Sequence, residues 1–204
     1  EGAGPLFDIG PYYITTLIHI FGPITTVAAV GSKARTTRTV QVGDRLGAEF
    51  TVEVPTHVSA IAQFAGGGVS QSVFSFQSPL ARMGFVEITG TEGTLIVPDP
   101  NAFTGEVKIT RAAGLAMIRE EPEWEIVPIT GALAGRGLGV LDMARSIRSN
   151  SQHLVASGEL GYHVLDILVS IEEAIESRST VEVSSTVEPI PLLAEDWDPF
   201  QATL

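Results

Sequence analysis

The chain has 204 residues, 44% of them hydrophobic, which is enough to bury the core of one domain over residues 1–204. It contains no cysteine, which excludes disulfides, thiolate metal sites and a cysteine nucleophile. Its net charge is −12, with lysine only at positions 33 and 108, and this disfavours nucleic acid and anionic membranes as partners.

The start of the sequence indicates a piece of a longer protein. It opens at Glu1 without a methionine and without a basic-then-apolar leader, so it shows no signal peptide. No apolar run approaches the roughly 20 residues that a bilayer span requires. We therefore expect a cytoplasmic protein with no membrane partner, part of which precedes Glu1.

An amphipathic helix is predicted to open the chain. Its apolar side chains recur at spacings of three and four, on one face: Leu6, Ile9, Tyr13, Ile14, Leu17, Ile20 and Phe21. Gly22-Pro23 ends it, because glycine suits a left-handed cap and proline cannot continue a helix. Its start stays open between residues 5 and 9. Pro5 suits a first helical position, whereas Asp8 as the N-cap would place Pro11 in the first turn.

From about residue 24 to 130 the hydrophobic period is two, which predicts β-strands. We expect seven or eight, among them residues 50–54, 58–64, 70–76, 85–89, 94–97, 106–110 and 125–129. Glycine-rich turns at 66–68 and 90–93 separate neighbouring strands. Such short turns imply mainly antiparallel pairing, because parallel neighbours need long crossovers.

Helical spacing returns in the last third of the chain. A short amphipathic helix is predicted over residues 140–148 and a longer one over 157–177, with Ser157 as its N-cap. Residues 181–183 are expected to form an edge strand, followed by a proline-containing surface segment. This order predicts an α+β fold, an open and mainly antiparallel β-sheet with helices packed on one face.

Glycine clusters and histidines do not support a nucleotide or metal site. Gly2-Ala3-Gly4 and the glycines from 131 to 139 lack the spacing of the dinucleotide fingerprint, so both are interpreted as loops. No cofactor-binding residue is therefore assigned within the chain. The four histidines do not pair at ligand spacing, and no metal is expected. His163, beside the apolar face of the longer helix, is interpreted as a hydrogen-bonded structural residue.

The first helix also carries a polar stripe. Asp8 and Tyr12 are four residues apart and share a face, which Thr15, Thr16 and His19 continue. A phenol beside a carboxylate can pass a proton, but an ordinary tyrosine pKa of about 10 suits neutral pH poorly without a nearby cation. Neither lysine is placed by the sequence to supply one. The residues alone therefore favour the simpler alternative, in which Asp8 is an N-cap and Tyr12 a packing residue.

These residues resemble a known family. The run Gly-Pro-Leu-Phe-Asp-Ile-Gly-Pro-Tyr-Tyr at 4–13 is similar to the Asp-x-Gly-x-His/Tyr helix that lines the active site in the glucose–fructose oxidoreductase / inositol dehydrogenase / rhizopine-catabolism (Gfo/Idh/MocA) family. Residues 86–95 resemble the recurrent hairpin of its C-terminal domain, and residues 137–144 and 157–165 resemble its closing helices. The likeness spans nearly the whole chain.

The resemblance implies a C-terminal domain of the glyceraldehyde-3-phosphate dehydrogenase type. It implies an NAD(P)-dependent oxidoreductase acting on a sugar, inositol or related carbinol (a polyol or sugar substrate). The N-terminal Rossmann domain, absent here, would bind most of the NAD or NADP. By this resemblance Tyr12 occupies the catalytic His/Tyr position, and Asp8 orients the substrate or its acid/base partner. The family's catalytic lysine comes from the missing domain and would supply the cation that Tyr12 needs.

Substrate contacts are expected from Thr15, Thr16 and His19. Thr15 stands where an acidic residue is common in the family, so the substrate preference of acid-bearing members does not transfer. Many relatives assemble through the outer sheet face, which predicts a homo-oligomer with some of Ser70, Ser72, Phe74 and Phe76 at the contact. The isolated chain is expected to be inactive, because a hydride donor has nowhere to bind. The alternative is a non-catalytic binding or oligomerisation module derived from the same family.

Overall fold

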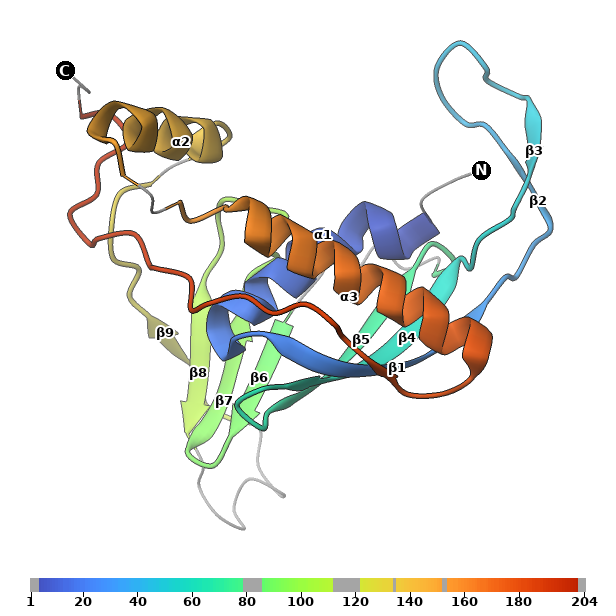
Figure 1. Ribbon diagram of the computed structural model, residues 1–204, viewed down its shortest axis with the longest axis horizontal. Helices are drawn as coiled ribbons and strands as arrows, with labels where there is room; N and C mark the ends of the chain where they lie inside the picture. The colour runs from blue at the N-terminus through green and yellow to red at the C-terminus, as the bar shows by residue number, and fades with distance from the viewer. Residues whose placement is uncertain (1–3, 79–85, 112–121, 134, 152–153, 202–204) are drawn as a thin grey trace. The chain divides into compact units, whose positions relative to one another are not determined.

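The chain forms two compact units. Unit 1 comprises Glu1–Ala81 and Ala156–Ile190, and unit 2 comprises Arg82–Val155 and Pro191–Leu204. The structure, a computed structural model, describes residues 4–78, 86–111, 122–133, 135–151 and 154–201. Figure 1 labels the helices and strands along the chain. That residues 1–204 act as one substrate-binding and assembly domain stays a prediction.

Unit 1 combines two helices with a four-stranded antiparallel sheet and a separate hairpin. The helices are α1 (Gly4–Phe21) and α3 (Gly158–Ser177). The sheet has the order β10-β1-β4-β5. Its strands are β1 (Ile24–Ser32), β4 (His57–Phe64), β5 (Val69–Ser75) and β10 (Val181–Glu182). The hairpin pairs β2 (Thr37–Thr39) with β3 (Glu49–Thr51).

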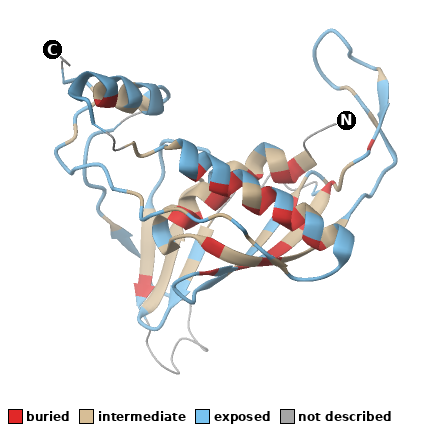
Figure 2. Ribbon diagram, viewed as in Figure 1, coloured by how far each residue is buried: buried red, intermediate tan, exposed pale blue. Residues whose placement is uncertain are grey.

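Both helices pack on one face of this sheet. The core of unit 1 lies between the helices and the sheet (Figure 2). Every second residue of β4 is buried there: Val58, Ala60, Ala62 and Phe64. Ala60 and Ala62 line one small space together with Ile167 of α3, which is fully buried. The alternation arises because successive strand residues point to opposite faces of a sheet. The predicted arrangement of helices on one face of an antiparallel sheet is therefore confirmed.

The first helix begins earlier than the range left open by the sequence. It starts at Gly4, whose φ of +58° is a conformation that glycine adopts readily, and Pro5 falls in its first turn. Asp8 therefore lies within the helix, and its interpretation as the N-cap is wrong. Pro11 is likewise inside the helix. Gly2 and Ala3, part of the first glycine cluster, lie outside the described residues.

The third helix begins where the sequence predicted. The hydroxyl of Ser157 accepts a hydrogen bond from the backbone N–H of Leu160 at 3.1 Å, which confirms Ser157 as the N-cap. The predicted edge strand is also confirmed. Val181 pairs with Val27 at the edge of the sheet, and the Val183 amide donates to the Thr25 carbonyl at 2.8 Å.

Unit 2 contains a second antiparallel sheet, with the order β6-β7-β8-β9. Its strands are β6 (Val86–Gly90), β7 (Gly93–Val97), β8 (Val107–Arg111) and β9 (Glu125–Val127). Position 85, the predicted start of the first of these strands, lies outside the described residues. The helix α2 (Leu138–Ser149) holds the tail of the chain. Its Arg145 donates to the carbonyls of Asp198 and Gln201 at 2.9 and 2.8 Å and stacks on Trp197.

The assignment of β5 residues to the outer sheet face needs correction. Ser70, Ser72 and Phe74 pair with Ala62, Ala60 and Val58, all of which are buried, so they point toward the helices. Phe74 is itself buried. The residues of β5 on the outer face are Val69, Gln71, Val73 and Ser75. The predicted alternation along β5 is correct, but the residues assigned to the outer face are those of the inner face.

Candidate functional site

Helices α1 and α3 approach each other closely at Gly10. A Cβ added at this position would lie 3.0 Å from Cδ2 of Leu168, so the contact requires glycine or a shift of the leucine. Both residues are buried. Away from this contact the two helices leave space between them.

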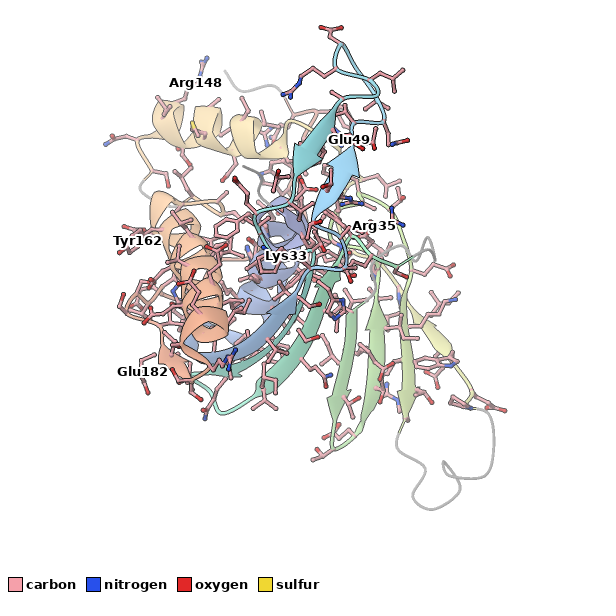
Figure 3. The ribbon with its side chains drawn as sticks, turned by 90° about the vertical axis from the view of Figure 1, so that its right-hand side faces the viewer. Lys33, Arg35, Glu49, Arg148, Tyr162 and Glu182 are labelled. Atoms are coloured by element: carbon pink, nitrogen blue, oxygen red, sulfur yellow. The ribbon has the colours of Figure 1, made fainter. Side chains whose placement is uncertain are left out.

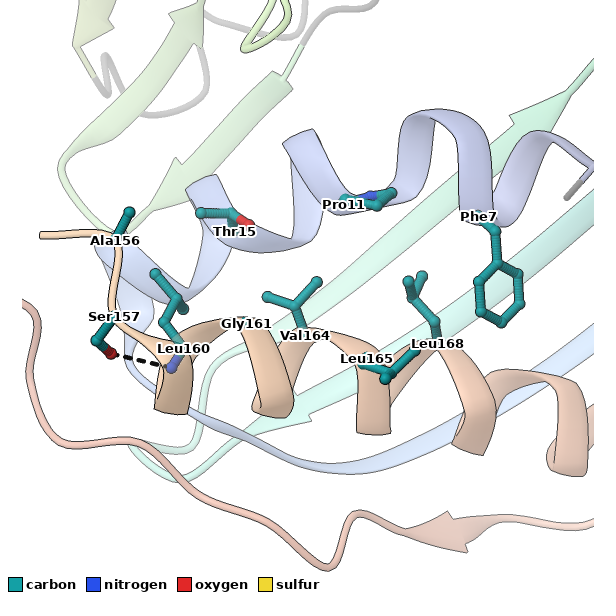
Figure 4. A pocket seen from close by; sticks show the side chains of 10 residues that line it. All are labelled: Phe7, Pro11, Thr15, Ala156, Ser157, Leu160, Gly161, Val164, Leu165 and Leu168. Carbon is teal, nitrogen blue, oxygen red and sulfur yellow. Dashed lines mark hydrogen bonds between the residues drawn. The ribbon is translucent and has the colours of Figure 1, made fainter. Parts of the chain in front are cut away.

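That space is a groove of about 420 Å³ on unit 1 (Figure 4). Its lining residues come from both helices and from the segment before α3: Phe7, Pro11, Thr15, Ala156, Ser157, Leu160, Gly161, Val164, Leu165 and Leu168. None of them is charged. Thr15 and Ser157 supply its side-chain hydroxyls, and the Ser157 oxygen already accepts the capping hydrogen bond from Leu160. The volume is that of a small-molecule site, and the lining suits an apolar group.

The polar stripe of α1 lies beside this groove. Asp8 is exposed and Tyr12 is 45% exposed. Among the described residues, neither side chain takes part in a hydrogen bond or ion pair, so both are available to a partner. Thr15 belongs to the stripe and also lines the groove. The structure thus places Asp8, Tyr12 and Thr15 along one accessible side of the helix.

The two remaining predicted residues differ in their availability. Thr16 donates its hydroxyl proton to the Tyr12 carbonyl at 3.0 Å, a bond within its own helix. His19 is half-buried, and burial lowers the pKa of its imidazole from the ordinary value of 6.5. The ring is therefore neutral at pH 7, so it can donate one hydrogen bond and accept another. Among the described residues, neither side chain is bound to the side chain of Asp8 or Tyr12.

His163 connects three segments of unit 1. It is fully buried in α3, where its Nε2 accepts the backbone N–H of Ile24 at 3.2 Å. The ring proton therefore lies on Nδ1, which donates to the Ser185 hydroxyl at 2.8 Å. Burial lowers the pKa of His163, although the nearby Asp166 carboxylate opposes this. The interpretation of His163 as a hydrogen-bonded structural residue is confirmed.

Asp166 extends this connection one turn along α3. Its Oδ2 accepts from the Ser185 amide at 2.8 Å and from the Ser184 hydroxyl at 3.1 Å. Partial burial raises its pKa, but these hydrogen bonds outweigh burial and the net shift is downward. Because Ile24 follows the end of α1 by three residues, the network fixes the turn between α1 and β1 against α3. The helix that carries the candidate residues is thereby held in place.

Among the residues that the structure describes, no three His, Asp or Glu side chains gather as a metal ion would require. Nor does any described helix combine the length and apolar character needed to cross a membrane.

A sequence comparison matches the first part of the chain to a family model. The family described as GFO/IDH/MocA C-terminal domain matches residues 1–96, which include all of α1 and the strands from β1 to β6. The resemblance predicted from α1 is therefore confirmed, and Asp8 and Tyr12 lie within the matched region. No curated protein matches the chain in a sequence search.

Solved structures share the fold of most of the chain. The apo form of levoglucosan dehydrogenase matches 90% of this chain and 52% of its own, at 23% identity and a TM-score of 0.70. An NAD-binding oxidoreductase from Klebsiella pneumoniae matches 89% and 51%, at 21% identity and a TM-score of 0.68. Aldose-aldose oxidoreductase from Caulobacter crescentus, complexed with glycerol, matches 88% and 47%, at 18% identity and a TM-score of 0.61. The chain thus spans about half the length of these structures.

Sequence reasoning missed the groove between α1 and α3. The available signal was the pair of helical glycines, Gly10 and Gly161, which serve opposite purposes. Gly10 permits close contact, whereas a Cβ at Gly161 would meet nothing within 4 Å and so would extend into open space.

Proposed function

We propose that this chain is the substrate-binding half of an NAD(P)-dependent oxidoreductase that acts on a sugar, inositol or related carbinol. The observation that carries the proposal is the pair Asp8 and Tyr12 on α1, both accessible and without side-chain partners among the described residues. Both lie in the region that matches the GFO/IDH/MocA C-terminal domain model. The similar fold of levoglucosan dehydrogenase, which has been solved in complex with NADH and levoglucosan, supports it.

The groove does not fit the pyrophosphate of a dinucleotide cofactor. A dinucleotide presents a pyrophosphate, which proteins bind with backbone amides at helix N-termini or with cationic side chains. The groove is lined by apolar residues and two hydroxyls and has no cation. The other half of the protein would therefore hold the NAD or NADP, which supplies the hydride acceptor or donor when bound.

In this proposal, the cofactor is held by the other half of the protein, and residues of α1 bind the carbinol and move its proton. Tyr12 takes the hydroxyl proton as the carbinol is oxidised, and returns it in the reverse direction. Asp8, one turn earlier, orients the substrate hydroxyl or the tyrosine. Thr15 and the neutral His19 offer hydrogen bonds to further hydroxyls, and Thr16 contributes less because its proton is used within the helix. A cation from the other half would stabilise negative charge on the phenol oxygen as the proton moves.

Assembly through the outer sheet face is part of this proposal. Val30 and Val73 both pair with Ser59, from either side, and Ile61 lies two residues along the same strand. All three of these apolar side chains are exposed. They provide an apolar patch on the face opposite the helices, as expected for a contact between subunits.

Substitution of Tyr12 in the longer protein tests the catalytic proposal. Tyr12→Phe should lower kcat by about 10²- to 10⁴-fold while leaving nicotinamide binding unchanged. Tyr13→Phe is the matched control, because Tyr13 is the next residue of the same helix but packs edge-on against Phe74 in the core. Equal turnover by wild type and Tyr12→Phe would remove Tyr12 from the mechanism.

The non-catalytic alternative is tested by cofactor binding. Calorimetry with NAD(H) and NADP(H) on this chain and on the longer protein distinguishes the two functions. Binding by the longer protein alone supports the oxidoreductase. Failure of both to bind favours a module retained for binding or oligomerisation, and binding by this chain would contradict the division proposed above.

A further inference from the structure

A two-stranded arm extends from the sheet of unit 1 (Figure 1). We define the arm as residues 33–51, which contain β2 and β3. Three residue pairs join its strands, and further backbone bonds close its end, including Val40 to Ala48 and Gly47 to Val40, both at 2.9 Å. Gly43 and Gly47 adopt φ values of +80° and +84°, which suit the turn. The arm is thus a defined hairpin with its own hydrogen bonds.

The arm makes few contacts beyond its base. Residues 41–47 are all exposed, and the tip presents Val42 at 80% and Leu46 at 69% exposure. At the base, Lys33 donates to the Glu53 carbonyl at 3.2 Å, and Arg38 donates to the Phe76 carbonyl at 3.5 Å. The six residues from 37 to 42 reach about 20 Å when extended. The tip therefore lies well away from the core of unit 1.

Such an arm needs another surface to be stable. An isolated two-stranded hairpin is marginal in water, and three strands or a packed apolar face are usually required. The β2–β3 pair has no third strand among the described residues. It also leaves two large apolar side chains in solvent at its tip. Both features indicate that the arm packs against a partner.

The charge of the arm identifies the kind of partner. The arm is basic. Its net charge over residues 33–51 is +2, from the basic residues Lys33, Arg35, Arg38 and Arg45 and the acidic residues Asp44 and Glu49. Because the whole chain is −12, the remaining residues together carry −14. The acidic remainder of a second copy therefore attracts the basic arm electrostatically. The net charges of two whole chains, by contrast, repel each other.

The acidic surface that best fits the arm lies at the end of α3 and on β10. Residues 172–188 contain five glutamates, Glu172, Glu173, Glu176, Glu182 and Glu188, against one arginine, Arg178. All but Glu172 are exposed. Burial and the adjacent Glu176 carboxylate raise the pKa of Glu172, as expected where negative charges are not neutralised. Figure 3 shows the labelled charged residues Lys33, Arg35 and Glu49 on the arm and Glu182 near the end of α3.

We propose that the β2–β3 arm docks on a second copy of this chain, with its basic residues against the acidic surface of residues 172–188 and Val42 and Leu46 buried at the contact. The arrangement is isologous, so each copy gives one arm and receives one. This contact is separate from the outer sheet face and does not depend on catalysis.

Cross-linking tests where the arm binds. The chain has no cysteine, so Val42→Cys introduces a unique thiol that takes a maleimide photo-cross-linker. A mixture of ¹⁴N- and ¹⁵N-labelled protein then separates cross-links between copies from those within one copy. We expect cross-links between copies that map to residues 172–188, and few from the control Leu192→Cys, which is similarly exposed at 84%. Cross-links confined to one copy, or directed to another surface, would overturn the proposal.

Sedimentation measures the contribution of the arm. The double variant Val42→Ser/Leu46→Ser should raise the dissociation constant of the dimer at least 10-fold, with unchanged circular dichroism, while Leu192→Ser has little effect. Raising salt from 0.05 to 0.5 M should weaken the wild-type dimer, because the contact between arm and α3 is charged. A wild-type monomer at all concentrations, or dissociation by Ile61→Ser but not by the arm variant, would contradict docking by the arm.

Discussion

The backbone amide of Ile24 donates a hydrogen bond to Nε2 of His163 across 3.2 Å, although the two residues lie 139 positions apart in the sequence. Both are buried. The bond connects the first strand of the sheet to the last helix of unit 1, immediately after the helix that bears Asp8 and Tyr12. Loss of this bond therefore affects stability and the position of the candidate site together.

Removal of the His163 imidazole should destabilise the protein. His163→Phe retains a ring of similar size but leaves the buried amide of Ile24 without an acceptor, and it also removes the bond to Ser185. We expect the free energy of unfolding to fall by about 2–4 kcal/mol in urea denaturation. The exposed Tyr162→Phe, on the preceding residue, should change it by less than about 0.5 kcal/mol. Equal stability of His163→Phe and wild type would show that the network contributes little.

The same histidine should make stability depend on pH. Burial lowers its pKa in the folded state below the unfolded value of about 6.5, so the unfolded chain binds the proton more readily. The contribution of neutral His163 to the free energy of unfolding is therefore complete above pH 6.5. It is lost as the pH falls from 6.5 toward the pKa of the folded state.

The measurement is the difference between wild type and His163→Phe across pH 5–8. This difference isolates His163 from Glu172, whose pKa is raised by burial and then by Glu176, and whose effect on stability has the opposite sign. We expect the advantage of the wild type to shrink as pH falls. An advantage that is constant with pH would refute the assignment of a neutral buried imidazole.

The N-cap of α3 gives a third prediction. Ser157→Ala removes the acceptor for the Leu160 amide and should cost about 1 kcal/mol in the free energy of unfolding. Ser157→Asp keeps an acceptor and adds a negative charge at the helix N-terminus, so it should retain the stability of the wild type. Thermal unfolding of the three proteins checks this order.

The two glycines of the helix pair should respond oppositely to alanine. Gly161→Ala places a methyl group in open space and removes the conformational freedom of glycine, so it should stabilise the protein by up to about 1 kcal/mol. Gly10→Ala places Cβ 3.0 Å from Cδ2 of Leu168. The resulting overpacking should cancel the stabilisation that alanine would otherwise give the helix. We expect Gly10→Ala to be at least about 1 kcal/mol less stable than Gly161→Ala in urea titrations. Equal values would show that Leu168 adjusts freely.

Local patterns in the sequence predicted local structure well. Ser157 was found because a cap and its helix are adjacent in the chain, and the turn at 90–93 because its glycines lie next to the strands they join. The α1 stripe was found for the same reason, since helical spacing alone places Asp8 and Tyr12 on one face. The family resemblance rested on these local segments and is confirmed over residues 1–96.

Features that depend on distant pairing were not predictable in this way. Alternation showed that β5 has two faces, but only its pairing with β4 shows that Ser70 and Ser72 point inward. The groove required two helices more than 100 residues apart to meet at Gly10 and Leu168. The division of the strands into separate sheets also depends on which strands pair, and periodicity carries no information on partners.

The path of the chain through unit 1 limits the order in which the protein can fold. Strand β1 is synthesised well before its outer neighbour β10 and the Ser185 contact of His163, which come some 150 residues later. All of Arg82–Val155 must be made before the chain returns to this unit. During translation β1 therefore has an open edge and an incomplete core, a state in which nascent chains are prone to associate wrongly. A protein truncated before residue 181 should remain in that state, however intact its candidate site residues are.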